Sequence, residues 1–208
     1  RTIHNVERNL LTKPAETIAQ ASQLVGQIAD SILSAPELAI HVMGDKAGGE
    51  ELYFHSLNVT MLSLMMARDI KLPQEAVQAL GMGALFHDVG RREIPNRILM
   101  KMEPLTVSER NLYELHCEYG VRIAQELKFP PLTLAIIHEH HEFFDGSGYP
   151  KKLKGEAISL FAKRAAVCDV YDAITSNRPY KPGWDPAESL HKMSEWASAH
   201  FDREVFLA

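Results

Sequence analysis

The sequence contains few of the residues that define several common protein classes. Its two cysteines, Cys117 and Cys168, lie far apart and form no Cys-x-x-Cys pair. This spacing disfavours both a disulfide framework and a zinc site built from thiolates. The formal net charge is −5, from 22 Lys and Arg against 27 Asp and Glu. Because a general nucleic-acid binder usually carries a basic face, the balance also argues against a DNA-binding protein.

Long apolar runs are also missing. No stretch approaches the ~20 apolar residues of a membrane-spanning helix, and the N-terminus lacks the pattern of a signal peptide. Unpaired cysteines fit a reducing compartment, so we expect a cytoplasmic protein. Because the sequence begins at Arg1 instead of Met, we expect it to be part of a longer chain whose N-terminal portion carries a sensory or receiver domain.

The residues that are present suffice for one globular domain. The chain has 208 residues, of which 46% are apolar, which is enough for a single core. Apolar residues recur every three or four positions, as on one face of an α-helix, and only residues 148–153 hint at short strand pairs. The expected fold class is therefore all-α. We expect residues 1–45 to form a leading helix or linker that packs on or leads into a main domain, residues 46–208.

Start and stop signals divide this chain into separate helices. Thr106 and Glu109 have the spacing of a capping box, in which each side chain accepts a hydrogen bond from the other residue's backbone N–H. This box predicts a helix that starts after Thr106 and carries His116. The other predicted helices cover residues 15–33, 50–69, 74–85, 132–142, 158–176 and 186–199.

Nitrogen and carboxylate donors recur along this helical chain. The most informative stretch is the adjacent pair His140-His141, which is followed by Glu142 and by a turn rich in glycine. Further donors are His55, His87, Asp88, His116 and Asp169. Imidazole and carboxylate ligands without thiolates suit divalent iron, manganese, nickel or zinc. The donors therefore predict a metal centre assembled from several helices.

The dipeptide His87-Asp88 indicates the chemistry of this centre. An imidazole can bind one cation while the neighbouring carboxylate bridges to a second. Two divalent ions ~3.5–4 Å apart stabilise both the attacking and the leaving oxygen of a phosphodiester and lower the pKa of a bound water toward ~7. Arg91, three residues after Asp88, is expected to bind a phosphate group through its guanidinium. Asp88 and Arg91 are therefore the predicted catalytic residues.

Other polar residues near the His140-His141 pair receive lesser roles. His138 precedes His141 by three residues, a spacing that places two side chains on one helix face, so spacing alone leaves it open as a ligand. Glu142 is expected to orient an imidazole rather than to bind metal. Four other histidines have no evident partner and are expected to be ordinary surface residues: His4, His41, His191 and His200.

Together these motifs resemble those of the HD-GYP family, helical phosphodiesterases of the HD superfamily that hydrolyse the bacterial second messenger cyclic di-GMP. The matching residues follow the family's order from about residue 50 to 205: His55, His87-Asp88-Val89-Gly90, Ile94-Pro95, Ile98-Leu99-Met100-Lys101, Leu105-Thr106, His116 with Gly120, His140-His141-Glu142 through Gly148-Tyr149-Pro150, Asp169-Val170-Tyr171-Asp172-Ala173 and Arg178-Pro179-Tyr180-Lys181. The resemblance implies an HD-superfamily helical bundle with a multinuclear metal centre. The ligands it implies are His55, His87, Asp88, His116, His140, His141 and Asp169, with His138 outside this set. It also implies that Arg178 and Lys181 contact the substrate phosphates together with Arg91.

The resemblance also bears on the number of metal ions. Glu51 lies four residues before His55, on the same helical face, and family members with a glutamate at this position bind a third ion. We therefore expect two or three divalent ions, with iron or manganese favoured and nickel or zinc also compatible with the ligands. The expected product is linear pGpG, with GMP left open as a further product.

One departure from the family pattern keeps alternative functions open. Arg91 stands where the family has a lysine, and the two cations differ in geometry. The main alternative is a catalytically degenerate domain that binds the nucleotide or a cyclase without turnover. A di-iron oxygenase of the HD type is a third hypothesis, although Arg178 and Lys181 suit phosphates better. By the same resemblance, the loop Gly148-Tyr149-Pro150 is expected to contact a diguanylate-cyclase (GGDEF) domain.

Overall fold

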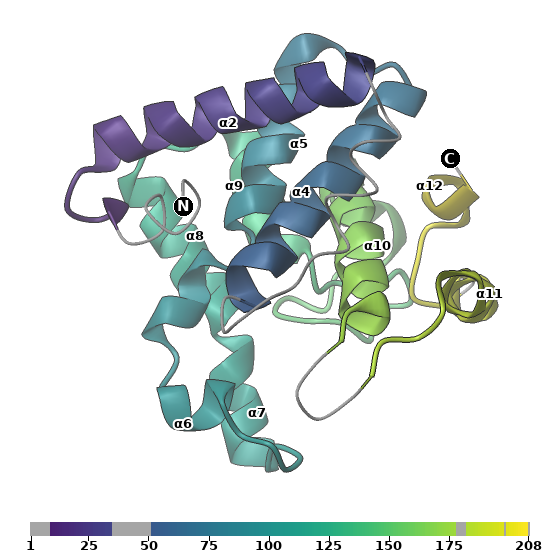
Figure 1. The fold of residues 1–208 in the computed structure, drawn as a ribbon. Coiled ribbons are helices and arrows are strands. Elements are labelled where there is room, and N and C mark those ends of the chain that lie inside the picture. The colour runs from purple at the N-terminus through teal and green to yellow at the C-terminus, as the bar shows by residue number, and fades with distance from the viewer. Residues whose placement is uncertain (1–8, 35–50, 178–181, 198, 208) are drawn as a thin grey trace.

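In the computed structural model, the chain forms a bundle of helices (Figure 1). The structure describes residues 9–34, 51–177, 182–197 and 199–207, and no strand occurs within these ranges. The predicted all-α fold class is therefore confirmed. The strand pairs considered at 148–153 do not form, since these residues lie in bends and irregular backbone.

Six helices match predicted ranges, with ends within about three residues of the predictions. They are α2 (Pro14–Ser34), α4 (Glu51–Asp69), α5 (Gln74–Phe86), α9 (Pro131–Glu139), α10 (Leu160–Thr175) and α11 (Pro186–Trp196). The other elements, with η marking a 3-10 helix, are η1 (Val89–Glu93), α6 (Asn96–Leu99), α7 (Val107–Glu114), α8 (His116–Glu126), η2 (Gly155–Ala157) and α12 (Arg203–Leu207). Within the described ranges, none of the helices has both the length and the apolar content needed to cross a bilayer.

The main apolar core lies where α2 crosses α4 and α5 (Figure 1). Val25 from α2, Leu64 from α4 and Phe86 from α5 are buried in it. The Gln78 side chain also donates a hydrogen bond to the Ser22 carbonyl at 3.0 Å. The leading helix expected within residues 1–45 is therefore packed into the bundle. The boundary predicted near residue 46 lies outside the described residues and stays a prediction.

The capping box is confirmed, but the helix it begins is shorter than predicted. The Thr106 hydroxyl accepts from the Glu109 N–H, and the Glu109 carboxylate accepts from the Thr106 N–H. The helix ends at Glu114, and His116 begins a separate helix, α8. The carbonyl of Tyr113 accepts both the Leu115 N–H and the His116 Nδ1–H, which ends α7 and turns the His116 ring.

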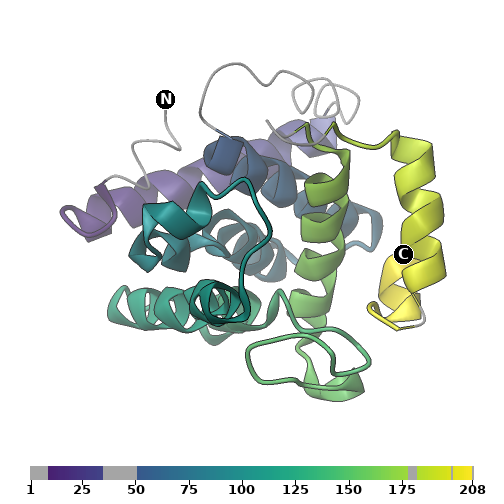
Figure 2. The same cartoon turned by 90° about the horizontal axis from the view of Figure 1, so that it is seen from below.

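The C-terminal helices α11 and α12 pack beside α10 (Figure 2), and the residues between them contact the loop that follows α9. The Phe144 N–H donates to the His200 carbonyl at 3.0 Å, and the Asp145 N–H donates to the Ala199 carbonyl at 2.8 Å. The rings of Phe143 and His200 stack with centroids 4.4 Å apart. The prediction that His200 has no partner is therefore wrong. Backbone hydrogen bonds join residues 199–200 to this loop, and the spacing of residues in the sequence does not predict them.

A buried lysine ties the same loop to α10. The ammonium of Lys163 lies 2.9 Å from Asp202 and 3.0 Å from Glu156, and it sits 5.1 Å from the centroid of the Phe144 ring. Burial by itself lowers the pKa of Lys163, but the two carboxylates outweigh it and raise that pKa. The charged lysine therefore joins α10 to η2 and to the C-terminal segment.

Candidate metal centre

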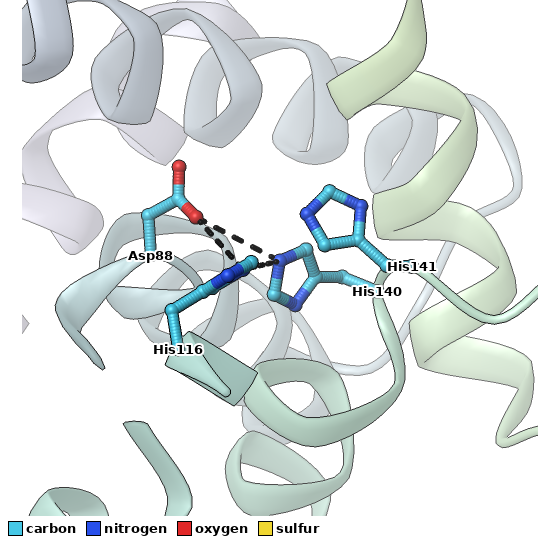
Figure 3. Close-up of side chains that lie close together, drawn as sticks. All are labelled: Asp88, His116, His140 and His141. Carbon is cyan, nitrogen blue, oxygen red and sulfur yellow. Dashed lines mark hydrogen bonds and ion pairs between the residues drawn. The ribbon is translucent and has the colours of Figure 1, made fainter. Parts of the chain in front are cut away.

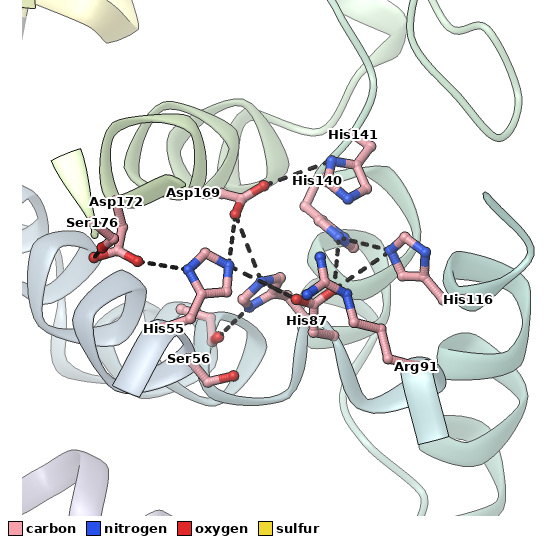
Figure 4. Close-up of polar contacts among 12 residues, drawn as sticks. His55, Ser56, His87, Arg91, His116, His140, His141, Asp169, Asp172 and Ser176 are labelled. Carbon is pink, nitrogen blue, oxygen red and sulfur yellow. Dashed lines mark hydrogen bonds and ion pairs between the residues drawn. The ribbon is translucent and has the colours of Figure 1, made fainter. Parts of the chain in front are cut away.

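The predicted donors meet between α4, α5, α8, α9 and α10 (Figure 4). They form two groups, and within each group the ligand atoms lie within 4.8 Å of one another. One group is Asp88, His116, His140 and His141, and the other is His55, His87 and Asp169. All are buried except His141, whose side chain is 18% exposed. Seven predicted ligands from distant parts of the chain therefore share one site.

Three other predicted site residues cannot be placed. Glu51 begins α4, but its side chain lies outside the described residues. Arg178 and Lys181 also lie outside them. Their roles as a third-metal ligand and as phosphate contacts stay predictions.

Helix ends position most of the donors. His87 follows the last residue of α5, and His116 is the first residue of α8. The helix predicted over 132–142 ends earlier, at Glu139, so His140 and His141 lie in the turn that follows α9. Adjacent residues in this turn present their imidazoles with centroids 4.1 Å apart and planes 44° apart. Both rings therefore reach the same group of donors.

The two oxygens of Asp88 face different donor groups. Its Oδ2 lies 3.2 Å from His87 Nε2 and 3.8 Å from His55 Nε2. Its Oδ1 lies 3.5 Å from His116 Nε2 and 3.8 Å from His140 Nε2, as Figure 3 shows. A carboxylate in this arrangement can bridge two cations, one on each oxygen.

Asp169 spans the two groups in the same way. Its Oδ1 lies 3.0 Å from His55 Nε2 and its Oδ2 lies 3.6 Å from His141 Nδ1. Burial by itself raises the pKa of Asp169, but the hydrogen bond and charge of His55 lower it well below its usual range. Asp169 is therefore ionised and supplies a second negative charge to the centre.

In each of three histidines, a hydrogen bond to a backbone carbonyl determines which ring nitrogen faces the centre. The Nδ1 atoms of His87, His116 and His140 lie 2.7, 2.7 and 3.0 Å from the carbonyl oxygens of Ala84, Tyr113 and Ile137, in that order. A carbonyl oxygen only accepts, so each Nδ1 must carry the hydrogen. The lone pair of each Nε2 therefore points to the other donors, which is the usual arrangement of a metal-binding histidine.

Several of these donor atoms have no hydrogen-bond partner although they are buried. They are His87 Nε2, both carboxylate oxygens of Asp88 and His141 Nε2. In addition, the Nε2 atoms of His116 and His140 lie 3.5 Å apart with their lone pairs facing each other. Buried polar atoms are nearly always satisfied, and a cation between these acceptors would satisfy them. The residues present therefore fit a divalent metal centre.

The pKa values of the histidines in the first group support this fit. Burial, followed by the nearby imidazoles of His141 and His87, lowers the pKa of His140 well below its usual value. Burial also lowers the pKa of His116, and it lowers that of His141 to about 3. These imidazoles are neutral at physiological pH, and neutral imidazole is the form that binds metal.

The group of His55, His87 and Asp169 differs, because a second carboxylate, that of Asp172, forms a hydrogen bond with His55. Burial by itself lowers the pKa of His55, but hydrogen bonds to Asp169 and Asp172 outweigh it and raise that pKa to about 9. Asp172 Oδ2 accepts from His55 Nδ1 at 2.7 Å, while its Oδ1 accepts from Asn58 and Ser176 at 2.7 and 2.9 Å. Sequence reasoning assigned no role to Asp172, although it follows Asp169 by three residues and so shares its helix face.

Asp172→Asn is expected to lower the affinity for divalent metal by about 10–100-fold, the usual effect of losing a residue that orients a ligand. The substitution keeps the shape of the side chain but removes the charge that orients His55. Titration of metal-depleted protein with Mn²⁺ measures the affinity. Asp30→Asn, on the exposed face of α2, is the control. Equal affinities in the two variants would contradict a role for Asp172.

One assignment made near His140 needs correction, whereas the placement of His138 outside the ligand set is confirmed. Glu142 accepts the N–H groups of Lys151 and Leu153 at 2.6 and 2.9 Å, so it closes the following loop instead of orienting an imidazole. His138 lies 3.1 Å from Glu118 and belongs to neither donor group. Spacing placed both residues near the ligands, but the end of α9 turns them toward other partners.

The closed loop brings Tyr149 against the centre. The Tyr149 N–H donates to the His141 carbonyl at 3.1 Å, and the two rings have centroids 4.7 Å apart. A Cβ atom on Gly148 would lie 2.3 Å from the Phe143 nitrogen, so this approach requires glycine. The loop therefore forms part of the wall beside His141.

Arg91 lies inside the centre. Its Nε lies 2.9 Å from Asp88 Oδ1, and a terminal nitrogen donates to the Tyr113 hydroxyl. Burial by itself raises the pKa of Asp88, but Arg91 and His87 outweigh it and hold that pKa well below its usual range. Arg91 therefore contacts the predicted metal ligand Asp88 directly. Its expected role, binding a substrate phosphate, did not predict this contact.

The fold and the site define an all-helical protein with a two-part histidine and aspartate metal centre. The sequence matches the HD domain family over residues 7–205. The chain belongs to this family, and its predicted membership of the HD-GYP group is confirmed.

Named relatives and a solved structure agree with this assignment. The chain is 42% identical over 191 residues to a cyclic di-GMP phosphodiesterase of Pseudomonas aeruginosa, covering 91% of this chain and 46% of that protein. It is 28% identical to the 3′3′-cGAMP-specific phosphodiesterase 2 of Vibrio cholerae, covering 98% of this chain and 40% of that protein. The HDG"Y"P protein Bd1817 of Bdellovibrio bacteriovorus has the same fold, with a TM-score of 0.82 at 20% identity over 99% of this chain and 67% of that one. The chain thus spans about half the length, or less, of these two curated relatives.

Proposed function

We propose that this chain is the catalytic domain of a metal-dependent phosphodiesterase that hydrolyses cyclic di-GMP. The arrangement of Asp88 carries the proposal, because its two oxygens face two separate groups of histidines. Two cations held close together stabilise both the attacking and the leaving oxygen of a phosphodiester, and a carboxylate between two donor groups suits such a pair. The 42% identity to a protein named as a cyclic di-GMP phosphodiesterase supports the choice of substrate.

In this proposal, the chain's residues bind the cations and orient the substrate. The seven donors of the two groups would hold the cations, and Asp172 and the backbone carbonyls orient the imidazoles. Bound divalent ions would neutralise charge on the phosphodiester and lower the pKa of the attacking water. Arg178 and Lys181 are proposed to bind the substrate phosphates, together with Arg91. The proposed product is linear pGpG, with GMP left open.

The two donor groups support two cations, and a third at Glu51 stays part of the proposal. Iron or manganese suits the imidazole and carboxylate donors, and nickel or zinc is compatible with them. Metal analysis of protein purified without oxygen tests both the identity and the number. A ratio of three ions per chain that falls to two in Glu51→Gln would support the third site.

The proposed partners follow from the family. We propose that the Gly148-Tyr149-Pro150 loop contacts a GGDEF domain, that a sensory or receiver domain precedes this chain in the full-length protein, and that the protein acts in the cytoplasm. The loop offers the exposed side chains of Lys151 and Lys152 beside Tyr149. Loss of GGDEF binding in a variant with both lysines changed to serine, with hydrolysis retained, would support the first of these proposals.

Incubation of the metal-loaded chain with cyclic di-GMP tests the function. We expect linear product from protein loaded with Mn²⁺ or Fe²⁺ under nitrogen, and less product from 3′3′-cGAMP at the same concentration. Faster cleavage of 3′3′-cGAMP would reassign the substrate, and turnover that requires oxygen would favour the oxygenase hypothesis.

The alternative function is a catalytically degenerate domain. The contact between Arg91 and Asp88 supports it, because the guanidinium pairs with a carboxylate that is predicted to bind metal. Equilibrium dialysis with cyclic di-GMP distinguishes the two. Measurable nucleotide binding without any linear product would support the alternative and contradict the proposed hydrolysis.

A further inference from the structure

The two oxygens of Asp88 do not have equivalent surroundings. Oδ1, which faces His116 and His140, lies 2.9 Å from Arg91 Nε. Oδ2, on the other side, has its ion-pair contacts with His87 and His55. The positive charge of Arg91 therefore lies beside Oδ1, the oxygen that Asp88 offers to the group of His116 and His140.

Arg91 is held in this position from two sides. It lies in the η1 turn, three residues after Asp88, and its terminal nitrogen donates to the hydroxyl of Tyr113. The guanidinium carbon lies 5.3 Å from the centroid of the Tyr113 ring. Its contact with Asp88 is an ion pair without hydrogen-bond geometry, since Arg91 Nε makes no hydrogen bond. The pairing is therefore close but not directional.

The donor groups also differ in their negative charge. The group of His55 and His87 includes Asp169, whose Oδ1 lies 3.0 Å from His55 Nε2. Among the described residues, the group of His116, His140 and His141 has one carboxylate, that of Asp88. Because like charges repel strongly where burial limits screening, Arg91 weakens cation binding mainly in this second group.

We propose that Arg91 competes with a metal cation for Asp88 Oδ1, so that the two donor groups bind their cations unequally and in order. The group of His55, His87 and Asp169 is filled first. Binding in the group of His116, His140 and His141 displaces the guanidinium, which then becomes available to a substrate phosphate. The inference rests on the metal binding included in the proposed function, but it does not require turnover.

Calorimetric titration of the metal-depleted chain with Mn²⁺ tests this order. We expect two classes of site in the wild type. Arg91→Gln is expected to tighten the weaker class by about 10-fold, within the range typical of coupled sites, and to leave the tighter class unchanged. Arg91→Lys keeps the charge and is expected to tighten it less. Tyr113→Phe, which removes one anchor of the guanidinium, is expected to act in the same direction as Arg91→Gln and more weakly.

The control is Arg92→Gln, which removes the same charge from the next residue of η1, where the side chain is exposed. Its isotherm is expected to match that of the wild type. Circular dichroism and thermal melting confirm that each variant is folded.

Three results would overturn the proposal. They are a single class of site in the wild type, unchanged affinities in Arg91→Gln, and a weakening of both classes in that variant, which would mean that Arg91 orients Asp88 instead of competing for it. If the chain hydrolyses no cyclic dinucleotide but Arg91→Gln still tightens the weaker class, the proposed function fails and the competition stands.

Discussion

Asp88→Ala is expected to abolish hydrolysis of cyclic di-GMP, with kcat/KM lowered by at least about 10³-fold. Asp88 offers one oxygen to each group of histidines, so its loss would remove a donor from both groups at once. Metal ions supply several kcal/mol of transition-state stabilisation, and each 1.36 kcal/mol changes a rate about tenfold. His87→Ala combined with Asp88→Ala is expected to lose both hydrolysis and bound metal.

Product formation and metal content of the purified variants measure these effects. Far-UV circular dichroism is expected to be unchanged, because His87 and Asp88 lie in the junction between α5 and η1 and not inside a helix. Asp30→Ala, an exposed carboxylate on α2, is the control and is expected to behave as the wild type does. Hydrolysis by Asp88→Ala at the wild-type rate would mean that the catalytic site lies elsewhere.

Gly90→Ala is expected to destabilise the chain by about 3 kcal/mol, the upper end of the usual cost of overpacking. A Cβ atom at residue 90 would lie 1.9 Å from the His116 carbonyl oxygen and 2.4 Å from the Gly120 nitrogen. Both contacts are with backbone, which cannot rotate away as a side chain can. Since η1 and α8 must separate, Asp88 and His116 move apart, and we expect metal binding to fall as well.

Urea unfolding and Mn²⁺ titration measure the two effects of Gly90→Ala. Gly26→Ala is the matched control, because a Cβ atom at residue 26 would meet nothing within 4 Å. Gly26 lies inside α2, where alanine is favoured over glycine by about 0.5–1 kcal/mol, so this variant is expected to be slightly stabilised. If Gly90→Ala were as stable as Gly26→Ala, η1 and α8 would not be in close contact.

Features that depend on neighbouring residues could be predicted from the sequence. The capping box of Thr106 and Glu109 formed as expected, because both partners lie within one helical turn. The ends of α4 and α5 also lie within about a residue of their predictions. These features depend on local periodicity and capping, which act over three or four residues.

Contacts between segments that are distant in the sequence could not be predicted in this way. His200 was expected to have no partner, yet its carbonyl accepts a hydrogen bond from the Phe144 N–H, more than fifty residues earlier in the chain. Glu142 was expected to orient an imidazole, but its carboxylate accepts hydrogen bonds from two backbone N–H groups of the following loop. A buried carboxylate accepts from whichever donors the packing brings near, and spacing along the chain does not specify them.

The sequence by itself determined the all-α fold class, the metal-binding chemistry and the seven donors that meet in one place. Only the tertiary structure decided that each oxygen of Asp88 serves a different group, that Asp172 supports His55, and that Arg91 adjoins one oxygen alone. The reason is physical: residue types state which atoms can bind a cation, whereas the packing of five helices sets the distances and directions among those atoms.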